Sequence, residues 1–310
     1  MTYTYDNNDN KTRLDSYLAA QLADMSRSRI QSLIKSGDIT VNASAAKPGY
    51  MLNFGDVIEV TAQEEVRDID ICPEDIPLDI VYEDSDVIVV NKPKDMVVHP
   101  ANGHYTGTLV NALMYHCRDS LSGINGELRP GIVHRIDKDT TGLIIACKND
   151  KAHNCIAAQL AEHSITRRYI ALVYNNIVED EGTVDANIER SRADRKMMAV
   201  CGPDEGRTAV THYRVLERFP AHGIYRMPMC LVECRLDTGR THQIRVHMAH
   251  ISHPLAGDEV YGIRKDIFRG CGQYLHAAVL GFTHPGTGER IELNAPLPEY
   301  FEEALRKLRA

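Results

Sequence analysis

The chain has 310 residues, of which 43% are apolar and 25% charged, a balance that suits one large and one small globular domain. No apolar run reaches the length of a membrane span, and the first residues lack the basic and apolar regions of a signal peptide, so we expect a cytoplasmic protein with no membrane partner. The formal net charge of -8 on its own argues against a nucleic-acid partner, because Lys and Arg make the phosphate contacts.

The distribution of charge along the chain weakens that argument. Acidic residues cluster over 64–86 and again near residue 180. Basic residues gather in four other places: 27–35, 129–138, 190–196 and 240–245. Local surface charge matters more for nucleic-acid binding than the total charge does, so an RNA partner stays open. The eight cysteines form no C-x-x-C pair, which favours reduced structural thiols over a disulfide framework or a zinc site.

A compact unit is predicted over residues 12–62, after a polar segment, residues 1–11, that we expect to be disordered. Its first helix carries apolar residues at helical spacing: Leu14, Leu18 and Leu22. A second helix is predicted from an N-cap at Ser26 to a stop at Gly37. Two strands follow, at 39–41 and 57–60.

An acidic linker, residues 63–76, separates this unit from a strand-rich region over 77–310. Strands are predicted at 87–90, 132–133, 143–146, 169–173, 209–215, 231–236 and 291–293. Helices are predicted at 109–117, 152–162, 241–250 and 299–308. Because these elements follow no βαβ rhythm, we expect an α+β fold with a mixed or antiparallel sheet.

The densest group of polar side chains lies in the run 131–148, between two apolar, strand-like stretches. Within it, Asp137 lies between Arg135 and Lys138, and an ionised carboxylate on a rigid loop can act as a nucleophile or a base. The residues alone equally allow a salt-bridged turn. Asp139 is a rival carboxylate, but the Asp-Thr-Thr-Gly sequence that it begins is typical of a turn.

A second polar run, residues 236–247, predicts a strand end at Gly239 and a helix capped by Thr241. Histidines at 242, 247, 250 and 253 superficially suggest a metal-dependent hydrolase. No H-x-x-x-H pair with an acidic partner is present among them, so we predict no metal site. The glycine-rich signatures of dinucleotide-binding proteins, P-loop proteins and α/β-hydrolases are also absent from the sequence.

Together, the run Gly131–Lys148 (GIVHRIDKDTTGLIIACK), the segment RRYIALV and the run LDTGRTHQIRVH resemble the RluA family of pseudouridine synthases, and the resemblance covers essentially all of residues 75–310. It implies that Asp137 is the catalytic residue and that Arg245 pairs with it. It also implies that Tyr169 lies under the flipped uracil and is suited to proton transfer. Further substrate contacts are expected from Arg135, Leu275, Arg240 and His242.

Residues 12–62 resemble the S4 RNA-binding domain through Arg13-Leu14-Asp15, the Ser-Arg-Ser-Arg run at 26–29 and Ile39-Thr40-Val41-Asn42. The family usually has Gly where this chain has Ala43, a small departure at a turn. The resemblance implies RNA contacts by basic residues of the helices: Arg27, Arg29 and Lys35.

The implied activity is the isomerisation of uridine to pseudouridine in RNA, most similar to enzymes that act on large-subunit ribosomal RNA. The reaction needs no cofactor, because the uracil is both leaving group and returning nucleophile. Whether Asp137 attacks C1′ or removes the 2′ proton stays open, and we expect a monomer. The alternative is a non-catalytic RNA-binding or ribosome-assembly factor on the same scaffold, which the intact set of Asp137, Tyr169 and Arg245 disfavours.

Overall fold

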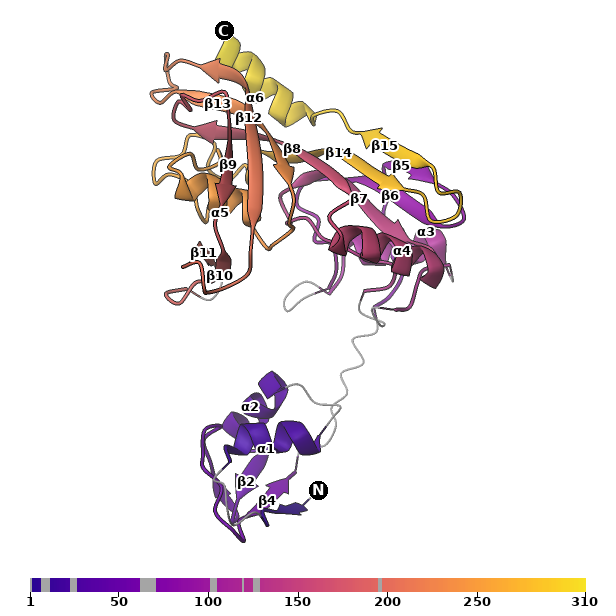
Figure 1. Ribbon diagram of the computed structural model, residues 1–310, viewed down its shortest axis with the longest axis vertical. Helices are drawn as coiled ribbons and strands as arrows, with labels where there is room; N and C mark the ends of the chain where they lie inside the picture. The colour runs from indigo at the N-terminus through magenta and orange to yellow at the C-terminus, as the bar shows by residue number, and fades with distance from the viewer. Residues whose placement is uncertain are drawn as a thin grey trace. The chain divides into compact units, whose positions relative to one another are not determined.

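The computed structural model describes residues 2–6, 12–22, 27–61, 71–100, 105–118, 120–124, 129–194 and 197–310 (Figure 1). The chain divides into two compact units, Met1–Asp68 and Ile69–Ala310. Each unit has its own buried apolar core. Within the described ranges, no helix combines the length and apolar character needed to cross a membrane.

The N-terminal unit is a four-stranded sheet with two helices. In sheet order the strands are β1 (Thr2–Thr4), β4 (Val57–Val60), β2 (Ile39–Val41) and β3 (Ser44–Ala45), and the helices are α1 (Leu14–Gln21) and α2 (Arg27–Ser36). The predicted helices and the strands β2 and β4 are confirmed, and Gly37 ends α2 with a φ of 87°. The predicted N-cap, Ser26, lies outside the described residues.

The expectation of disorder over residues 1–11 is corrected for its first part. β1 pairs antiparallel with β4, and the Tyr5 side chain that follows it is buried in the core of the unit. Alternating Thr and Tyr have high strand propensity, because branched and aromatic side chains pack well on a pleated surface. Residues 2–4 therefore had the propensity to form a strand, although the polar residues that follow them led us to expect disorder.

The C-terminal unit is built on a nine-stranded mixed sheet, which confirms the α+β class. Its strands in order are β5 (Ile80–Glu83), β6 (Val87–Lys92), β7 (Thr141–Cys147), β14 (Leu275–Thr283), β8 (Thr166–Tyr174), β13 (Met229–Leu236), β12 (Val210–Phe219) and β9 (Glu181–Asp185), with β15 (Arg290–Asn294) also paired to β14. The pair β7–β14 is parallel and the other pairs are antiparallel. A small sheet joins β10 (Ile188–Arg190) to β11 (Met198–Val200).

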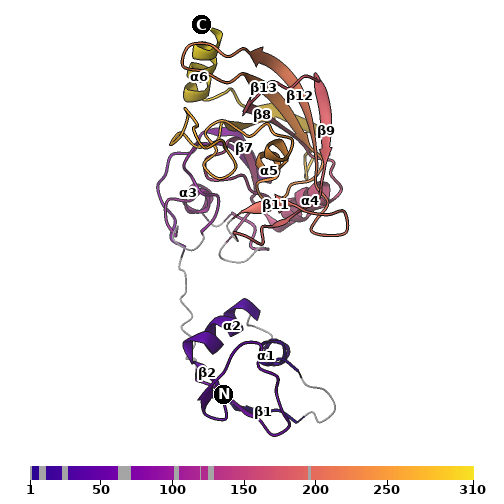
Figure 2. The same ribbon diagram turned by 90° about the vertical axis from the view of Figure 1, so that its left-hand side faces the viewer.

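Helices cover both faces of this sheet. On one face lie α3 (Leu109–Cys117) and α5 (Gln243–His250), and on the other lie α4 (Asp150–Ala161) and α6 (Glu299–Arg309). Alternate residues of each central strand enter opposite cores, so that Ile88 packs with α3 and Val89 with α4. Because both faces are covered, the central strands are almost continuously apolar. Figure 2 shows α5 on the inner side of the curved strands β13, β12 and β9.

Three expectations about this unit need correction. Ile132 forms only an isolated bridge to Ala146, and the rest of the predicted strand at 132–133 belongs to a loop. The linker expected to extend to residue 76 ends earlier: Ile71 is buried against the main core, and Asn111 of α3 donates a hydrogen bond to the carbonyl of Cys72. The strands β5, β9, β10, β11 and β14 were not predicted, since they are short, half-exposed or interrupted by His and Gly.

Candidate active site

Asp137 lies in the loop that precedes β7, and its partner comes from a distant part of the chain. The Nη1 of Arg245, on α5, donates to Oδ2 of Asp137 at 2.9 Å across a sequence separation of 108 residues. The basic neighbours of Asp137 in the sequence are directed elsewhere. Lys138 pairs with Asp95 at 2.8 Å, and Arg135 is exposed and makes no hydrogen bond or ion pair within the described residues. The sequence therefore predicted the carboxylate, but nearest-neighbour charges did not identify its partner.

A buried lysine holds the loop of Asp137 in place. The Nζ of Lys92, whose side chain is 1% exposed, donates to the carbonyls of Pro93, Met96 and Lys138 at 2.8, 2.8 and 2.9 Å. Burial lowers the pKa of Lys92 to about 7, against the opposing effect of nearby carboxylates such as Asp139. The carbonyl of Lys138 directly follows Asp137, so Lys92 fixes the backbone at the position where the carboxylate is presented.

The close approach of β7 to β14 needs a glycine. Gly142 has a φ of 106°, and a Cβ at this position would collide with the backbone of Ala277. Beside it, Gln273 donates to Oγ1 of Thr140 at 3.1 Å. The Asp-Thr-Thr-Gly turn is thus tied to the strand that carries Leu275 at its start.

Arg245 is itself held by a second carboxylate. Its Nε and Nη2 donate to Asp258 at 2.6 and 2.8 Å, and its guanidinium lies 5.1 Å from the ring centroid of Tyr261. Both charged side chains are buried, with Arg245 5% exposed and Asp258 3% exposed. Burial alone would raise the pKa of Asp258, but the hydrogen bonds and charge of Arg245 outweigh it, and the pKa is held below its usual range. The fork formed by Nε and Nη2 therefore faces Asp258, and Nη1 contacts Asp137.

His242 lies near Oδ1 of Asp137, the carboxylate oxygen that Arg245 does not bind. It precedes α5 with a φ of 57°, and its Nδ1 is 2.8 Å from the hydroxyl of Tyr261, which also accepts from the N–H of Met198. The Nε2 of His242 faces Oδ1 of Asp137 at 3.9 Å, too far for a direct hydrogen bond. Burial lowers the pKa of His242, against the charge of Asp137, so the neutral imidazole is favoured at pH 7.

The start of α5 differs from the expectation that Thr241 caps a helix at 241–250. The helix begins at Gln243, and the residue before it has no side-chain cap. Gln243 instead accepts from the Arg240 N–H and donates to the carbonyl of Val210, both at 2.9 Å. A buried amide thus connects the loop to β12, a role that helix periodicity does not signal.

The structure brings every predicted site residue of the C-terminal unit to one pocket of about 460 Å³. Tyr169 on β8 and Leu275 on β14 form apolar walls of it and lie on neighbouring strands. Burial raises the pKa of Tyr169, which keeps its hydroxyl protonated. The pocket is lined by these predicted residues: Arg135, Asp137, Tyr169, Arg240, His242, Arg245 and Leu275. The sequence analysis assigned no role to four residues at or near the pocket: Lys92, Arg167, Asp258 and Tyr261.

In the N-terminal unit, Arg27 binds a buried carboxylate and is also exposed to solvent. Asp15 is fully buried at the side chain, and it accepts from Arg13 at 3.0 Å and from Arg27 at 3.2 Å. Arg27 is nevertheless 52% exposed at the side chain, and Lys35 is exposed in the last turn of α2. The side chain of Arg29 lies outside the described residues.

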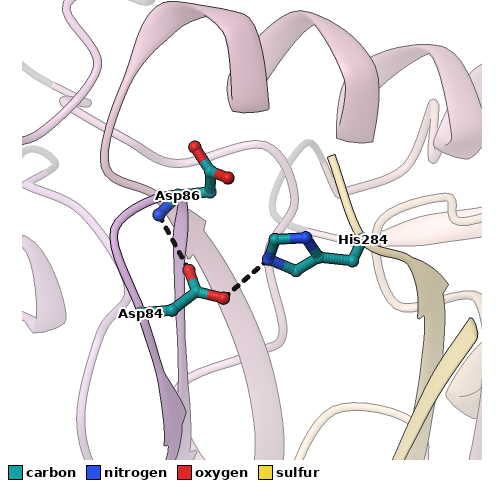
Figure 3. A group of neighbouring side chains, drawn as sticks. All are labelled: Asp84, Asp86 and His284. Carbon is teal, nitrogen blue, oxygen red and sulfur yellow. Dashed lines mark hydrogen bonds and ion pairs between the residues drawn. The ribbon is translucent and has the colours of Figure 1, made fainter. Parts of the chain in front are cut away.

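Among the described residues, one group of side chains lies close enough together for metal ligation: Asp84, Asp86 and His284 (Figure 3). Protein groups already occupy these ligand atoms. His284 Nε2 donates to Asp84 at 2.6 Å, while its Nδ1 accepts from the N–H groups of Gly286 and Thr287. Asp86 accepts from Asn149 at 2.8 Å. We interpret the group as a junction between the β5–β6 and β14–β15 turns. The histidines of the 242–253 run have other structural contacts, such as His247 with Thr211.

Comparisons with known proteins find matching family models, relatives and a solved structure. A family model described as RNA pseudouridylate synthase matches residues 86–250, and one described as S4 domain matches residues 12–58. The chain is 54% identical over 298 residues to the RNA pseudouridine synthase YlyB of Bacillus subtilis, covering 96% of this chain and 94% of that protein. It is 46% identical over 296 residues to the ribosomal large subunit pseudouridine synthase D of Zymomonas mobilis, covering 93% and 90%. The solved structure of human RNA Pseudouridylate Synthase Domain Containing 1 superimposes with a TM-score of 0.58 at 26% identity, covering 76% of this chain and 95% of that one.

Proposed function

The chain belongs to the RNA pseudouridine synthase family, carries an S4 domain and is an RNA pseudouridine synthase, and from this premise we propose that it modifies large-subunit ribosomal RNA with Asp137 as its catalytic residue. The name of the relative from Zymomonas mobilis supports the choice of RNA. The observation that carries the assignment of Asp137 is its 2.9 Å pair with Arg245 in a pocket that also contains Tyr169 and Leu275.

The reaction requires the uridine to leave the RNA stack, because a stacked nucleotide cannot present its sugar to a carboxylate. A pocket of about 460 Å³ lies within the range of small-molecule sites and suits one nucleotide. Leu275 and the ring of Tyr169 supply apolar walls for the extruded base, and stacking on an aromatic ring contributes about 1–3 kcal/mol. Arg135 is exposed at the pocket and unpaired within the described residues, so it is free to stabilise the flipped state.

At the sugar, the N1–C1′ bond breaks, the uracil turns over, and C5 bonds to C1′. The proton on C5 is then lost and N1 gains a proton, so the product is an isomer of the substrate. Asp137 acts at C1′ or at the 2′ proton, and Arg245 holds the carboxylate through a hydrogen bond to Oδ2. Tyr169 lines the same pocket with a protonated hydroxyl, so it would act as a relay that accepts the proton from C5 while its own proton passes to solvent, from which N1 is protonated.

The S4 domain adds affinity for RNA through its basic helix surface. Arg27 and Lys35 are exposed on α2, and we expect them to contact phosphates. We also propose that the acting unit is a monomer, and the composition together with an RNA substrate supports a cytoplasmic location.

The test is to map pseudouridines in ribosomal RNA from cells with and without the gene. The proposal predicts loss of at least one pseudouridine from large-subunit RNA, its return with the wild-type gene, and no return with Asp137→Asn. Unchanged large-subunit RNA would overturn the assignment of the target, and full rescue by Asp137→Asn would overturn the assignment of the catalytic residue.

A further inference from the structure

Arg167 is a buried cation without a partner on the wall of the pocket. It lies on β8 two residues before Tyr169, so both side chains project from the same face of the strand. Arg167 is 7% exposed and lines the same pocket. Its Nε is buried without a hydrogen-bond partner, and the side chain makes no hydrogen bond or ion pair with any described residue. Among the described residues, Arg167 therefore has no counter-charge bound to it at the wall of the pocket.

Two nearby arginines, Arg168 and Arg245, differ from Arg167 in that each has carboxylate partners. The Nε of Arg168, on the opposite face of β8, is likewise buried without a partner, but the Nη2 of Arg168 pairs with Glu292 at 2.9 Å and its Nη1 lies 3.8 Å from Glu233. Arg245, in the same pocket, has two carboxylate partners. A guanidinium stays protonated in proteins, and a buried charge without a partner is unfavourable, so the exception at Arg167 calls for a ligand.

The surroundings of Arg167 exclude a protein anion as that partner. Asp137 is the one carboxylate among the described residues that line the pocket, and its Oδ2 already accepts from Arg245. Burial, aided by the charge of Arg167, lowers the pKa of His134 to about 3, which leaves that neighbour a neutral imidazole. A Cβ at Gly239 would lie 2.6 Å from the Nη1 of Arg167, so the absence of a side chain there makes room for the guanidinium.

We propose that Arg167 binds a phosphate group of the RNA backbone adjacent to the uridine in the pocket. A phosphodiester brings the missing negative charge and two non-bridging oxygens, which match the planar fork of donors on a guanidinium. A uracil carbonyl would accept a hydrogen bond but would leave the charge uncompensated. This inference rests on the proposed function, since it takes an RNA nucleotide as the occupant of the pocket. Arg167 is then a substrate-binding residue, and its positive charge attracts an anionic substrate to a protein whose net charge is -8.

The test measures binding of two small probes, uridine and uridine 3′,5′-bisphosphate, to the full chain by calorimetry. Arg167→Met keeps the aliphatic stem and removes the charge, and Arg168→Met is the matched control on the opposite face of the strand. Because a hydrogen-bonded ion pair is lost, we expect Arg167→Met to weaken bisphosphate binding about 10- to 100-fold. Binding of uridine should be unchanged, and Arg168→Met should bind both probes like the wild type. Arg167→Lys should retain part of the affinity, as a point charge without the fork.

Thermal melting separates this role from a structural one. Loss of an unpaired buried charge should leave the melting temperature of Arg167→Met unchanged or higher, whereas Arg168→Met loses ion pairs and should melt lower. Equal weakening of both probes, bisphosphate affinity unchanged in Arg167→Met, or a wild type that does not bind the bisphosphate would each overturn the proposal. Failure of the proposed function shows itself separately, because Arg167-dependent bisphosphate binding would persist even if no pseudouridine in ribosomal RNA depended on the gene.

Discussion

The variant Asp258→Asn tests whether the activity of Asp137 depends on the contacts that hold Arg245 in place. Asp258→Asn removes the charge from a carboxylate that accepts two hydrogen bonds from Arg245, at 2.6 and 2.8 Å, in a site where both side chains are at least nine-tenths buried. Breaking a buried pair by removing one partner costs about 3–5 kcal/mol. Since the Asn oxygen still accepts one bond, we expect about 3 kcal/mol, or about 6–12 °C in melting temperature for a domain of this size.

The effect on turnover should exceed what unfolding explains. With Asp258 neutral, the guanidinium of Arg245 is free to turn its fork toward Asp137 and to bind both of its oxygens. A displacement of this kind costs about 100-fold in rate. We expect turnover per folded molecule to fall by roughly that factor, measured as release of tritium from RNA labelled at C5 of its uridines, while RNA affinity stays nearly constant.

Asp266→Asn is the matched control for Asp258→Asn. Asp266 lies in the same segment and accepts from the Gly257 N–H at 2.7 Å and the Tyr174 hydroxyl at 2.6 Å, but it does not touch Arg245. We expect it to lose stability and to keep its turnover. Equal turnover per folded molecule in wild type and Asp258→Asn would refute the reasoning. The pKa of Asp258 is depressed in the fold, so its contribution to stability is present above its ordinary pKa and is lost as the pH falls through the folded value.

Three further outcomes are expected. Burial would raise the pKa of Asp84, but hydrogen bonds from Tyr82, backbone N–H groups and His284 lower it to about 2. Asp84→Asn should therefore lose about 2 kcal/mol of unfolding free energy at pH 7. In denaturation curves this difference from the wild type should vanish as the pH falls from about 4 to about 2. Tyr169→Phe should bind RNA normally and form little product, and Tyr169→Ala should lose binding as well; full activity of the Phe variant would exclude proton transfer by the hydroxyl. Deletion of residues 1–62 should leave a folded catalytic unit, since that unit has its own core, with weaker RNA binding and a shallower salt dependence; an unchanged salt slope would mean that the S4 domain does not bind RNA.

Apolar periodicity predicted the main elements because each is amphipathic or buried on its own. The helix at 109–117 and the strands at 39–41 and 57–60 agree with the structure to the residue. Periodicity failed where pairing with a distant strand decides the outcome. His276, the second residue of β14, forms a hydrogen bond with Thr141 on the parallel strand β7. This contact stabilises the strand, but nothing in the sequence near His276 indicates it.

The site divides in the same way. The resemblance of short runs to a known family indicated Asp137, Tyr169 and Arg245 and the pairing of Arg245 with Asp137, which the basic residues next to Asp137 in the sequence do not reveal. The supports of the site were not predictable from spacing, because Lys92 and Asp258 act through contacts that the fold alone creates. A buried lysine in an apolar strand and an aspartate in a loop carry no pattern of their own.

Product formation by Asp137→Asn tests the central claim most directly. The substitution is nearly isosteric, keeps an oxygen for Arg245, and removes the nucleophile or base. With Asp139→Asn as the control from the same loop, the variants are compared by tritium release from C5-labelled large-subunit RNA and by melting temperature. We expect no detectable product from Asp137→Asn, substantial product from Asp139→Asn, and intact folding of both. Turnover by Asp137→Asn comparable to that of Asp139→Asn would contradict the claim.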